Sequence, residues 1–379
     1  VCDPGYLRDG ENCIASPCIG VNCGTNSSCV VTADNNPLCV CNPGYLRNGD
    51  NCIASPCTGI NCGGHGSCVV TGLNEALCVC NQGYRPDGTN CVEDDPVCEA
   101  PSVCANGWCL IPACTFQMGS PSNEGCRKNN EGPVHLVTIT RPFFMKQTEV
   151  TQGEWKAIYG TNPSHADLCG DDCPVENVNW YAAVDYANRL SLEDGFNQCY
   201  TLYGCNGTPG TASFNCSSAS FAGLRCNGYR LPTEAEWEHA TRAGTTTAYW
   251  IGSNIGSNGL PVCNNGDPSG TGLPEIAWYA YSSGNESHPV GQKLPNQWGL
   301  YDVHGSVAEW VYDFYSATYY DYCAQGCTDP IGFQGGTTRV YRGGWFIAHA
   351  DKLRSAARLD AAPSYSAYMI GLRLARSLP

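Results

Sequence analysis

The sequence is poor in positive charge. It has 20 Lys and Arg residues against 35 Asp and Glu residues, which gives a formal net charge of −15 at pH 7. Proteins that bind nucleic acid need clustered Lys and Arg side chains to contact the phosphates. The composition therefore argues against a nucleic acid partner, whereas an acidic surface suits solubility and the binding of divalent cations.

The sequence also lacks a long apolar run. No stretch approaches the length of about 18 residues that a membrane-spanning helix requires, so we expect no membrane span. No signal peptide is visible at the start of the chain. Because a secreted precursor would not begin at Val1, we expect a mature or trimmed form of a protein with further N-terminal sequence.

Three patterns that often mark catalytic or metal sites are missing. There is no C-x2-C pair, which argues against cysteine-rich metal knuckles. The seven His residues form no H-x3-H pair, which argues against a non-haem iron site. No G-x-S-x-G occurs, so nothing indicates a serine nucleophile of that kind.

Cysteine, in contrast, is abundant. The chain has 28 Cys residues, 14 within the first 91 positions and 14 in the remaining 288. An even total allows complete pairing, and complete pairing requires an oxidising compartment. We therefore expect an extracellular protein, secreted or at the cell surface, with a disulfide-dense N-terminal part and a larger globular part.

The N-terminal part is a repeat. Residues 1–18 read VCDPGYLRDGENCIASPC and residues 40–57 read VCNPGYLRNGDNCIASPC, a period of 39 residues. A unit of this size with six Cys residues cannot build a hydrophobic core large enough to fold alone, so disulfides must stabilise it. The spacing, with a C-x-C pair followed by a Gly-Tyr turn, resembles that of EGF-like modules.

The EGF resemblance implies a set of boundaries and disulfides. It implies the end of a truncated module over residues 1–13, complete modules over 14–52 and 53–91, and a Cys-containing connector over 92–113. Because Ile-Ala-Ser-Pro precedes the first Cys of each module in place of acidic residues, we expect no calcium there. The implied pairs are Cys2–Cys13, Cys18–Cys29, Cys23–Cys39, Cys41–Cys52, Cys57–Cys68, Cys62–Cys78 and Cys80–Cys91.

Three helices are predicted in the part that begins near residue 114. Thr151 and Glu154 form a capping box that opens the first, and residues 179–191 carry apolar side chains at helical spacing. A second capping box, Thr233 and Glu236, opens the third, which Gly244 ends. Short strands and ordered loops must account for the rest. The charged residues on and beside the third helix are predicted to form structural ion pairs: Arg230, Glu234, Glu238 and Arg242.

Seven segments of this part match one pattern in order and spacing. They are CTFQMGS (114–120), EGPVHLVTITRPFFMKQTEVTQGEW (131–155), PVENVNWYAAVDYANRLS (174–191), YRLPTEAEWEHATRAG (229–244), HPVGQKLPNQWGLYDVHGSVAEW (288–310), RVYRGGW (339–345) and GLRLARS (371–377). Residues 114–379 thereby resemble the formylglycine-generating enzyme family, or sulfatase-modifying-factor domain. The resemblance implies a C-type-lectin-like fold: an α+β domain with little regular secondary structure.

The family's catalytic metal site does not carry over. Its enzymes oxidise a sulfatase Cys to formylglycine with copper bound by two Cys residues near the C-terminus. Counted from Arg342-Gly343-Gly344, those positions hold Ala348 and Leu353, and no Cys follows Cys327. Thiolates are the soft ligands that suit Cu(I), so we expect no copper and no formylglycine synthesis. Cys323 and Cys327 are the nearest substitutes, and we expect them to be paired.

The family's structural calcium site does match. In GLYDVHGSVAEW (299–310) the resemblance implies carboxylate ligands from Asp302 and Glu309 and carbonyl ligands from Gly305 and Val307. Hard oxygen ligands from one tight loop are what Ca²⁺ prefers. The alternative is an ordinary turn with two solvated acids. The family's second calcium loop corresponds to residues near 264–267.

The segment after Arg-Gly-Gly is an exposed face in relatives that serve for display, and it also resembles segments diversified by retroelements. Clustered aromatic residues there suit a carbohydrate or protein ligand, although the same residues could be buried core. The candidate contact residues are Trp345, Phe346, His349, Tyr365 and Tyr368.

Together these features predict a non-catalytic extracellular adhesion or structural protein, in which an EGF-like stalk carries a head without copper ligands. Its partners would be further copies of itself, as a homo-oligomer or filament, or a surface protein or glycan. The alternatives are an extracellular enzyme with formylglycine-generating or related oxidase chemistry, and a ligand- or glycan-binding receptor.

Overall fold

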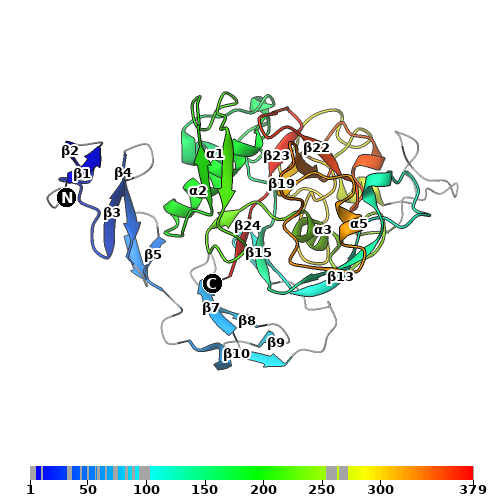
Figure 1. Ribbon diagram of the computed structural model, residues 1–379, viewed down its shortest axis with the longest axis horizontal. Coiled ribbons are helices and arrows are strands. Elements are labelled where there is room, and N and C mark those ends of the chain that lie inside the picture. Colours follow the sequence, from blue (N-terminus) through cyan, green and yellow to red (C-terminus); the bar gives the residue numbers. More distant parts are fainter. Residues whose placement is uncertain are drawn as a thin grey trace.

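The computed structural model describes residues 6–9, 12–31, 36–42, 45–48, 51–55, 57, 60–64, 66–70, 76–81, 84–87, 90–93, 103–252, 263 and 272–378. It shows small hairpins leading into one larger head (Figure 1). The head is α+β with short elements and long ordered loops, and it has the C-type-lectin-like fold of the formylglycine-generating enzymes. The predicted fold class is confirmed.

Antiparallel two-stranded hairpins form the N-terminal modules. They are β1 (Tyr6–Asp9) with β2 (Asn12–Ala15), β3 (Ser27–Val31) with β4 (Pro37–Cys41), β5 (Tyr45–Asn48) with β6 (Asn51–Ala54), β7 (Gly66–Val70) with β8 (Ala76–Cys80), and β9 (Tyr84–Asp87) with β10 (Asn90–Glu93). The 3₁₀ turn η1 (Cys62–Gly64) precedes β7. No hairpin of this size is stable alone, so cross-links must hold each in place.

Disulfides supply those cross-links. The structure contains Cys18–Cys29, Cys23–Cys39, Cys41–Cys52, Cys57–Cys68 and Cys62–Cys78, which are pairs that the EGF resemblance implies. The pairs Cys2–Cys13 and Cys80–Cys91 involve side chains outside the described part of the chain. Cys323 and Cys327 are bonded to each other, and no cysteine in the described part is free.

Three sheets build the head. The first has the order β11 (Cys104–Ala105), β12 (Trp108–Ile111), β15 (Phe143–Lys146), β24 (Ala375–Ser377) and β18 (Tyr229–Arg230). The second has β13 (Cys114–Met118), β14 (His135–Ile139) and β20 (Cys327–Thr328). The third has β22 (Leu359–Ala361), β21 (Arg339–Arg342), β19 (Ala308–Phe314) and β23 (Ile370–Leu372). In addition, β16 (Tyr200–Tyr203) pairs with β17 (Ser218–Phe221) as a separate ribbon.

Strands β11 and β12 belong to the first of these sheets. The head therefore begins inside the expected connector, before residue 114.

The three predicted helices are present as α1 (Gln152–Tyr159), α2 (Trp180–Glu193) and α3 (Glu234–Arg242). Both capping boxes form, at Thr151 with Glu154 and at Thr233 with Glu236. The left-handed residue that ends α3 is Ala243, one residue before the expected Gly244. Short turns complete the head: η2 (Asn129–Glu131), η3 (Asp167–Cys169), α4 (Leu273–Ile276), α5 (Tyr319–Tyr322) and η4 (Ala350–Lys352).

The core of the head is divided between two large clusters. One packs α1 and α2 against β19 and β23 around Trp155, Trp180 and Trp310, and the other packs α3 around Trp237. All four indoles are fully buried. Among the residues described, no helix combines the length and the apolar character that crossing a bilayer would need.

The last EGF-like module is packed against the head. Val69 and Val79 of β7 and β8 share a buried cluster with Leu110, Phe144 and Leu378 of the head. Figure 1 shows β7 beside the C-terminal end of the chain, where β24 leaves the sheet. The module therefore contacts the head through apolar side chains, in addition to the covalent connection.

This contact makes a prediction about stability. Val79 is 5% exposed, so in Val79→Asp a carboxylate replaces a buried side chain, and we expect the head to lose about 2 kcal/mol of unfolding free energy. All nine Trp residues lie between positions 108 and 345, so their fluorescence in guanidinium reports on the head. Ile19→Asp is the matched control, because Ile19 is 56% exposed in the preceding module. Identical midpoints for Val79→Asp and the wild type would refute the contact.

Candidate functional site

The positions of the family's copper ligands are buried in apolar surroundings. Ala348 is 2% exposed and Leu353 is fully buried. They lie in a cluster of apolar and tyrosine side chains: Ala248, Tyr249, Leu273, Ile276, Ala277, Tyr279 and Ala350. No sulfur ligand stands at either position, and in the described part of the chain every cysteine is in a disulfide. The residues present do not fit a copper ion, because Cu(I) needs soft thiolate or thioether ligands.

Two buried histidines of the head, His304 and His239, contact backbone groups through their ring nitrogens. His304 accepts the backbone N–H of Trp250 at Nε2, which leaves Nδ1 to donate to the Leu353 carbonyl at 2.7 Å. His239 contacts the Pro112 carbonyl through Nε2 at 2.9 Å and packs between Phe116 and Trp298. Burial lowers the pKa of each imidazole to about 4, so both are neutral at pH 7.

His239 predicts a pH dependence of stability. In the folded chain the pKa of about 4 lies below the ordinary histidine pKa of 6.5, so the unfolded chain binds more protons between these pH values. Stability contributed by His239 is thus complete above pH 6.5 and is lost as the pH falls toward 4, to a total of about 3 kcal/mol. In His239→Gln, denaturation at a series of pH values should give a flatter dependence. Parallel curves for variant and wild type would contradict this assignment.

Three carboxylates and one guanidinium lie buried around the predicted calcium loop. Glu309 stands on β19, Asp302 in the loop before it, Glu149 after β15 and Arg373 after β23. Arg373 donates to Glu309 Oε1 from Nη2 at 2.7 Å, and its Nη2 lies 3.7 Å from Glu149 Oε2. Lys293 also acts on Asp302 through its charge, so two cations face three acids and the acids are in excess.

Some oxygens of this cluster accept no hydrogen bond in the described structure. Asp302 accepts the Gly291 N–H at Oδ2, but its Oδ1 and both Glu149 carboxylate oxygens are buried without a hydrogen bond in the described structure. Burial raises the pKa of both acids, and the neighbouring carboxylates add to this effect. Orphaned buried oxygens and excess negative charge are what a hard divalent cation would satisfy.

The two predicted carboxylate ligands, Asp302 and Glu309, lie near each other, but their surroundings differ. Asp302 Oδ1 accepts no hydrogen bond, whereas both oxygens of Glu309 are engaged, Oε1 by Arg373 and Oε2 by the indole N–H of Trp237 at 2.6 Å. Gly305 must be glycine, because its φ is +94° and a Cβ would lie 2.2 Å from the Trp278 carbonyl. Val307 is fully buried beside it. Glu149 is not among the ligands predicted from the sequence, although it lies in the matching segment EVTQGEW.

The candidate contact residues after Arg-Gly-Gly divide into core and surface. Phe346 is 7% exposed, so its proposed contact role is corrected: it is a core side chain. Trp345 is half-buried and packs against two apolar clusters. His349, Tyr365 and Tyr368 are exposed. Tyr368 also lies 6.0 Å from the ring of His165, a surface residue that sequence reasoning did not single out.

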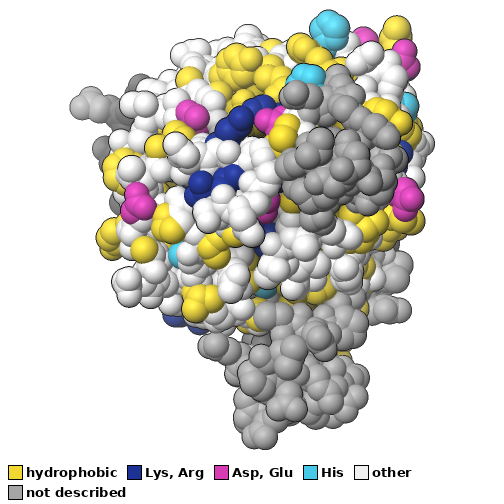
Figure 2. Space-filling model, turned by 90° about the vertical axis from the view of Figure 1, so that its right-hand side faces the viewer, with side chains coloured by type: hydrophobic (Ala, Val, Ile, Leu, Met, Phe, Trp, Pro, Cys, Tyr) yellow, Lys and Arg dark blue, Asp and Glu magenta, His cyan; other side chains and the backbone are white. Residues whose placement is uncertain are grey.

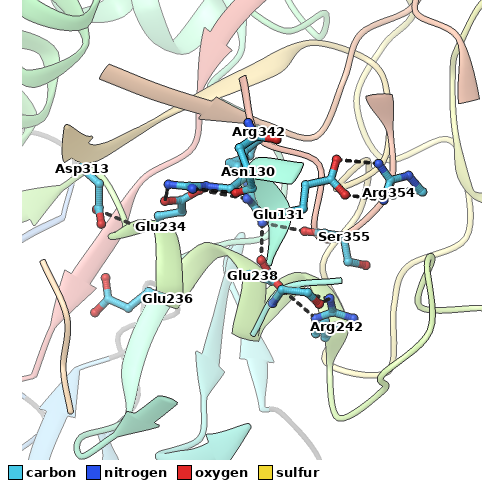
Figure 3. A network of polar contacts seen from close by, with 12 residues as sticks. Asn130, Glu131, Glu234, Glu236, Glu238, Arg242, Asp313, Arg342, Arg354 and Ser355 are labelled. Carbon is cyan, nitrogen blue, oxygen red and sulfur yellow. Dashed lines mark hydrogen bonds and ion pairs between the residues drawn. The ribbon is translucent and has the colours of Figure 1, made fainter. Parts of the chain in front are cut away.

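A buried ionic network fastens the loops that carry this surface. Arg342 on β21 bridges Glu234 and Glu238 of α3 (Figure 3). Arg358 also binds Glu234. Arg354 binds Glu131 through two nitrogens, as Figure 3 shows. Arg242 pairs with Glu238 and Arg230 with Glu236, which confirms structural ion pairs at this helix. These side chains are buried, so their ion pairs hold the surrounding loops in place.

The comparisons with known proteins decide the family. The family model of the sulfatase-modifying factor enzyme 1-like domain matches residues 96–378, which is more than half of the chain. The chain belongs to this family. The model of the first EGF domain of MSP1 matches residues 17–53, so the EGF-like character of the N-terminal part is shown as well.

Relatives within the sulfatase-modifying factor family have different names. The chain is 29% identical to the formylglycine-generating enzyme of Thermomonospora curvata, over 73% of this chain and 95% of that protein. It is 33% identical to the chaperone protein LppX of Paenibacillus barcinonensis, over 48% of this chain and 65% of that protein. Among solved structures, Treponema denticola variable protein 1 superposes with a TM-score of 0.56 at 29% identity, over 72% of this chain and 95% of that one. The family thus includes proteins that are not named for formylglycine synthesis.

Proposed function

We propose that this chain is a non-catalytic extracellular protein, in which disulfide-bonded EGF-like modules carry a ligand-binding head of the sulfatase-modifying factor fold. The proposal rests on one observation. Ala348 and Leu353, at the positions where the family's enzymes bind copper, are apolar side chains buried in a hydrophobic cluster. The number of disulfides supports an oxidising, extracellular location. A self-assembling filament would be one form of this function.

The surface of the head supports ligand binding. Tyr365 and Tyr368 are 43% and 44% exposed, and Tyr368 lies beside His165. Tyrosines are good contact residues because they bring a large contact area with few rotatable bonds. On the face seen in Figure 2, Lys and Arg side chains form separate small groups among hydrophobic and uncharged side chains, and this suits a protein or glycan ligand better than nucleic acid.

A turnover assay tests the absence of catalysis. The chain is incubated with a sulfatase-type Cys-x-Pro-x-Arg peptide, copper and oxygen, and the peptide is analysed by mass spectrometry. We expect no formylglycine above background, because no thiolate is available at positions 348 and 353. The Thermomonospora curvata enzyme serves as the positive control. Formylglycine formed by this chain would overturn the proposal.

A binding assay tests the ligand face. Tyr365→Ser with Tyr368→Ser should lose ligands captured on glycan and protein arrays, with an unchanged melting temperature, because both side chains are exposed. Tyr322→Ser is the matched control, because Tyr322 is 81% exposed on α5. Equal loss in the control, or no loss in the double variant, would remove these tyrosines from the binding site.

We also propose that a calcium ion stabilises the head at Asp302. The orphaned oxygens of Asp302 and Glu149 support this, and the carbonyls of Gly305 and Val307 would complete the ligand set that the family resemblance implies. The ion would neutralise the excess negative charge beside Arg373 and tie β19 to the loop before it. It has no catalytic role in this proposal.

A further inference from the structure

One surface of the head combines an exposed leucine with acidic residues. Leu168 on η3 is 98% exposed, the highest value among the large hydrophobic side chains described. The Cys169–Cys173 disulfide closes the loop that follows it. A leucine held in water by a cross-linked loop contributes nothing to the core, so its apolar surface is free for a partner.

Two further segments lie beside this loop. The Cys169 sulfur is 3.2 Å from the Ser287 carbonyl, and Val290 donates its N–H to the Asp172 carbonyl. On the other side, Asn177 donates to the Ala367 carbonyl, and His165 meets Tyr368. We call the surface formed by residues 165–172, 281–290 and 365–368 the Leu168 face. Its exposed aromatic residues are Tyr281, Tyr365 and Tyr368.

The Leu168 face is acidic. Asp167, Asp171, Asp172 and Glu286 are exposed on it, and its three segments contain no Lys or Arg. Lys156 of α1 pairs with Asp171 at 2.6 Å, with the Asp171 side chain still 69% exposed. Three exposed carboxylates remain in addition to that pair, so the face attracts positive charge.

A buried carboxylate lies directly behind this surface. Glu176 is fully buried, and its Oε1 accepts the N–H of Ala166, within the turn that presents Leu168. Its Oε2 is buried without a hydrogen-bond partner in the described structure. Burial raises the pKa of Glu176 to about 7, and the nearby Asp167 adds to the effect. A positive group arriving at the face would stabilise the ionised form of this acid.

We propose that the Leu168 face binds a basic segment of a partner protein, with Leu168 and the neighbouring tyrosines as apolar anchors and the acids as a charged rim. Buried apolar anchors surrounded by complementary charge are the arrangement of protein interfaces. The acids of the face would repel sulfated or sialylated glycans, which are negatively charged. The proposal rests on the binding function proposed above and specifies its partner.

The test uses the whole chain and a labelled peptide of alternating Lys and Leu residues, followed by fluorescence anisotropy. We expect binding that weakens with salt, and a dissociation constant about tenfold higher in Leu168→Ser. Asp167→Asn with Asp172→Asn should reduce the salt dependence. All three side chains are exposed, so these variants keep the fold. A peptide of alternating Glu and Leu residues should not bind.

Asp321→Asn with Tyr322→Ser, on α5, is the matched control, since it removes an exposed acid and an exposed aromatic side chain elsewhere. Equal weakening in this control, or equal binding of the Glu/Leu peptide, would overturn the proposal. Leu168-dependent self-association in sedimentation equilibrium would also overturn it, by making the face a contact between copies. If a glycan ligand depends on Tyr365 and Tyr368 but not on Leu168, the binding function stands and only the basic partner is refuted.

Discussion

Replacing Arg354 by Met is expected to destabilise the head by about 3–5 kcal/mol, which corresponds to a fall of about 10 °C in melting temperature. Arg354 is fully buried and donates to Glu124 and Glu131 at 2.6–2.7 Å. Its removal leaves two carboxylates, 7% and 1% exposed, without their cation. Scanning calorimetry at neutral pH measures the effect.

Two controls distinguish this network from ordinary surface charge. Lys128→Ala should cost less than about 0.5 kcal/mol, because the Lys128–Asp351 pair is 3.9 Å long and the lysine is 57% exposed. Adding Glu124→Gln and Glu131→Gln to Arg354→Met should recover part of the loss, since the unpaired charges are then gone. A melting temperature of Arg354→Met equal to that of Lys128→Ala would contradict the buried network.

Calcium is expected to raise the melting temperature of the wild type and not that of Asp302→Asn with Glu149→Gln. An ion at a thousandfold excess over its dissociation constant adds about 4 kcal/mol of stability. In EDTA the double variant should be at least as stable as the wild type, because it removes two buried acids whose carboxylate oxygens lack partners. Calorimetry with calcium and with EDTA measures both effects.

Glu309→Gln is the control for the calcium experiment. Its carboxylate binds Arg373 and Trp237 in the structure, so this variant should lose stability with and without calcium. If calcium does not change the melting temperature of the wild type, the cluster is not a calcium site. If calcium stabilises the double variant as much as the wild type, Asp302 and Glu149 are not its ligands.

Local signals explain which elements were predictable. A capping box needs only residues three positions apart, and both predicted boxes form, at Thr151 and Thr233. Disulfide spacing within an EGF-like module is also local, since each described pair within the modules spans 11 or 16 residues. The family followed from segments that keep their order along the chain, and the model match over residues 96–378 confirms it.

Contacts between distant segments explain what sequence reasoning missed. Glu149 meets Asp302 and Arg373 only because the strands and loops that carry them are adjacent in the fold, and an acid before a capping box otherwise suggests a solvated side chain. Phe346 was a candidate contact residue because an aromatic side chain after a turn can face either side. In the structure the Phe346 backbone carbonyl accepts a hydrogen bond from the Ser283 hydroxyl, and the Phe346 side chain is buried in the core.

By itself, the sequence determined the EGF-like repeat, the capped helices, the family of the head and the absence of cysteines at positions 348 and 353. These features depend on residue identity and short spacing. The tertiary structure alone decided that the last module packs on the head through Val69 and Val79, that Glu149 joins the acidic cluster, and that Leu168 stands exposed among acids. Each of these depends on which surfaces the long loops bring together, and no local pattern encodes that.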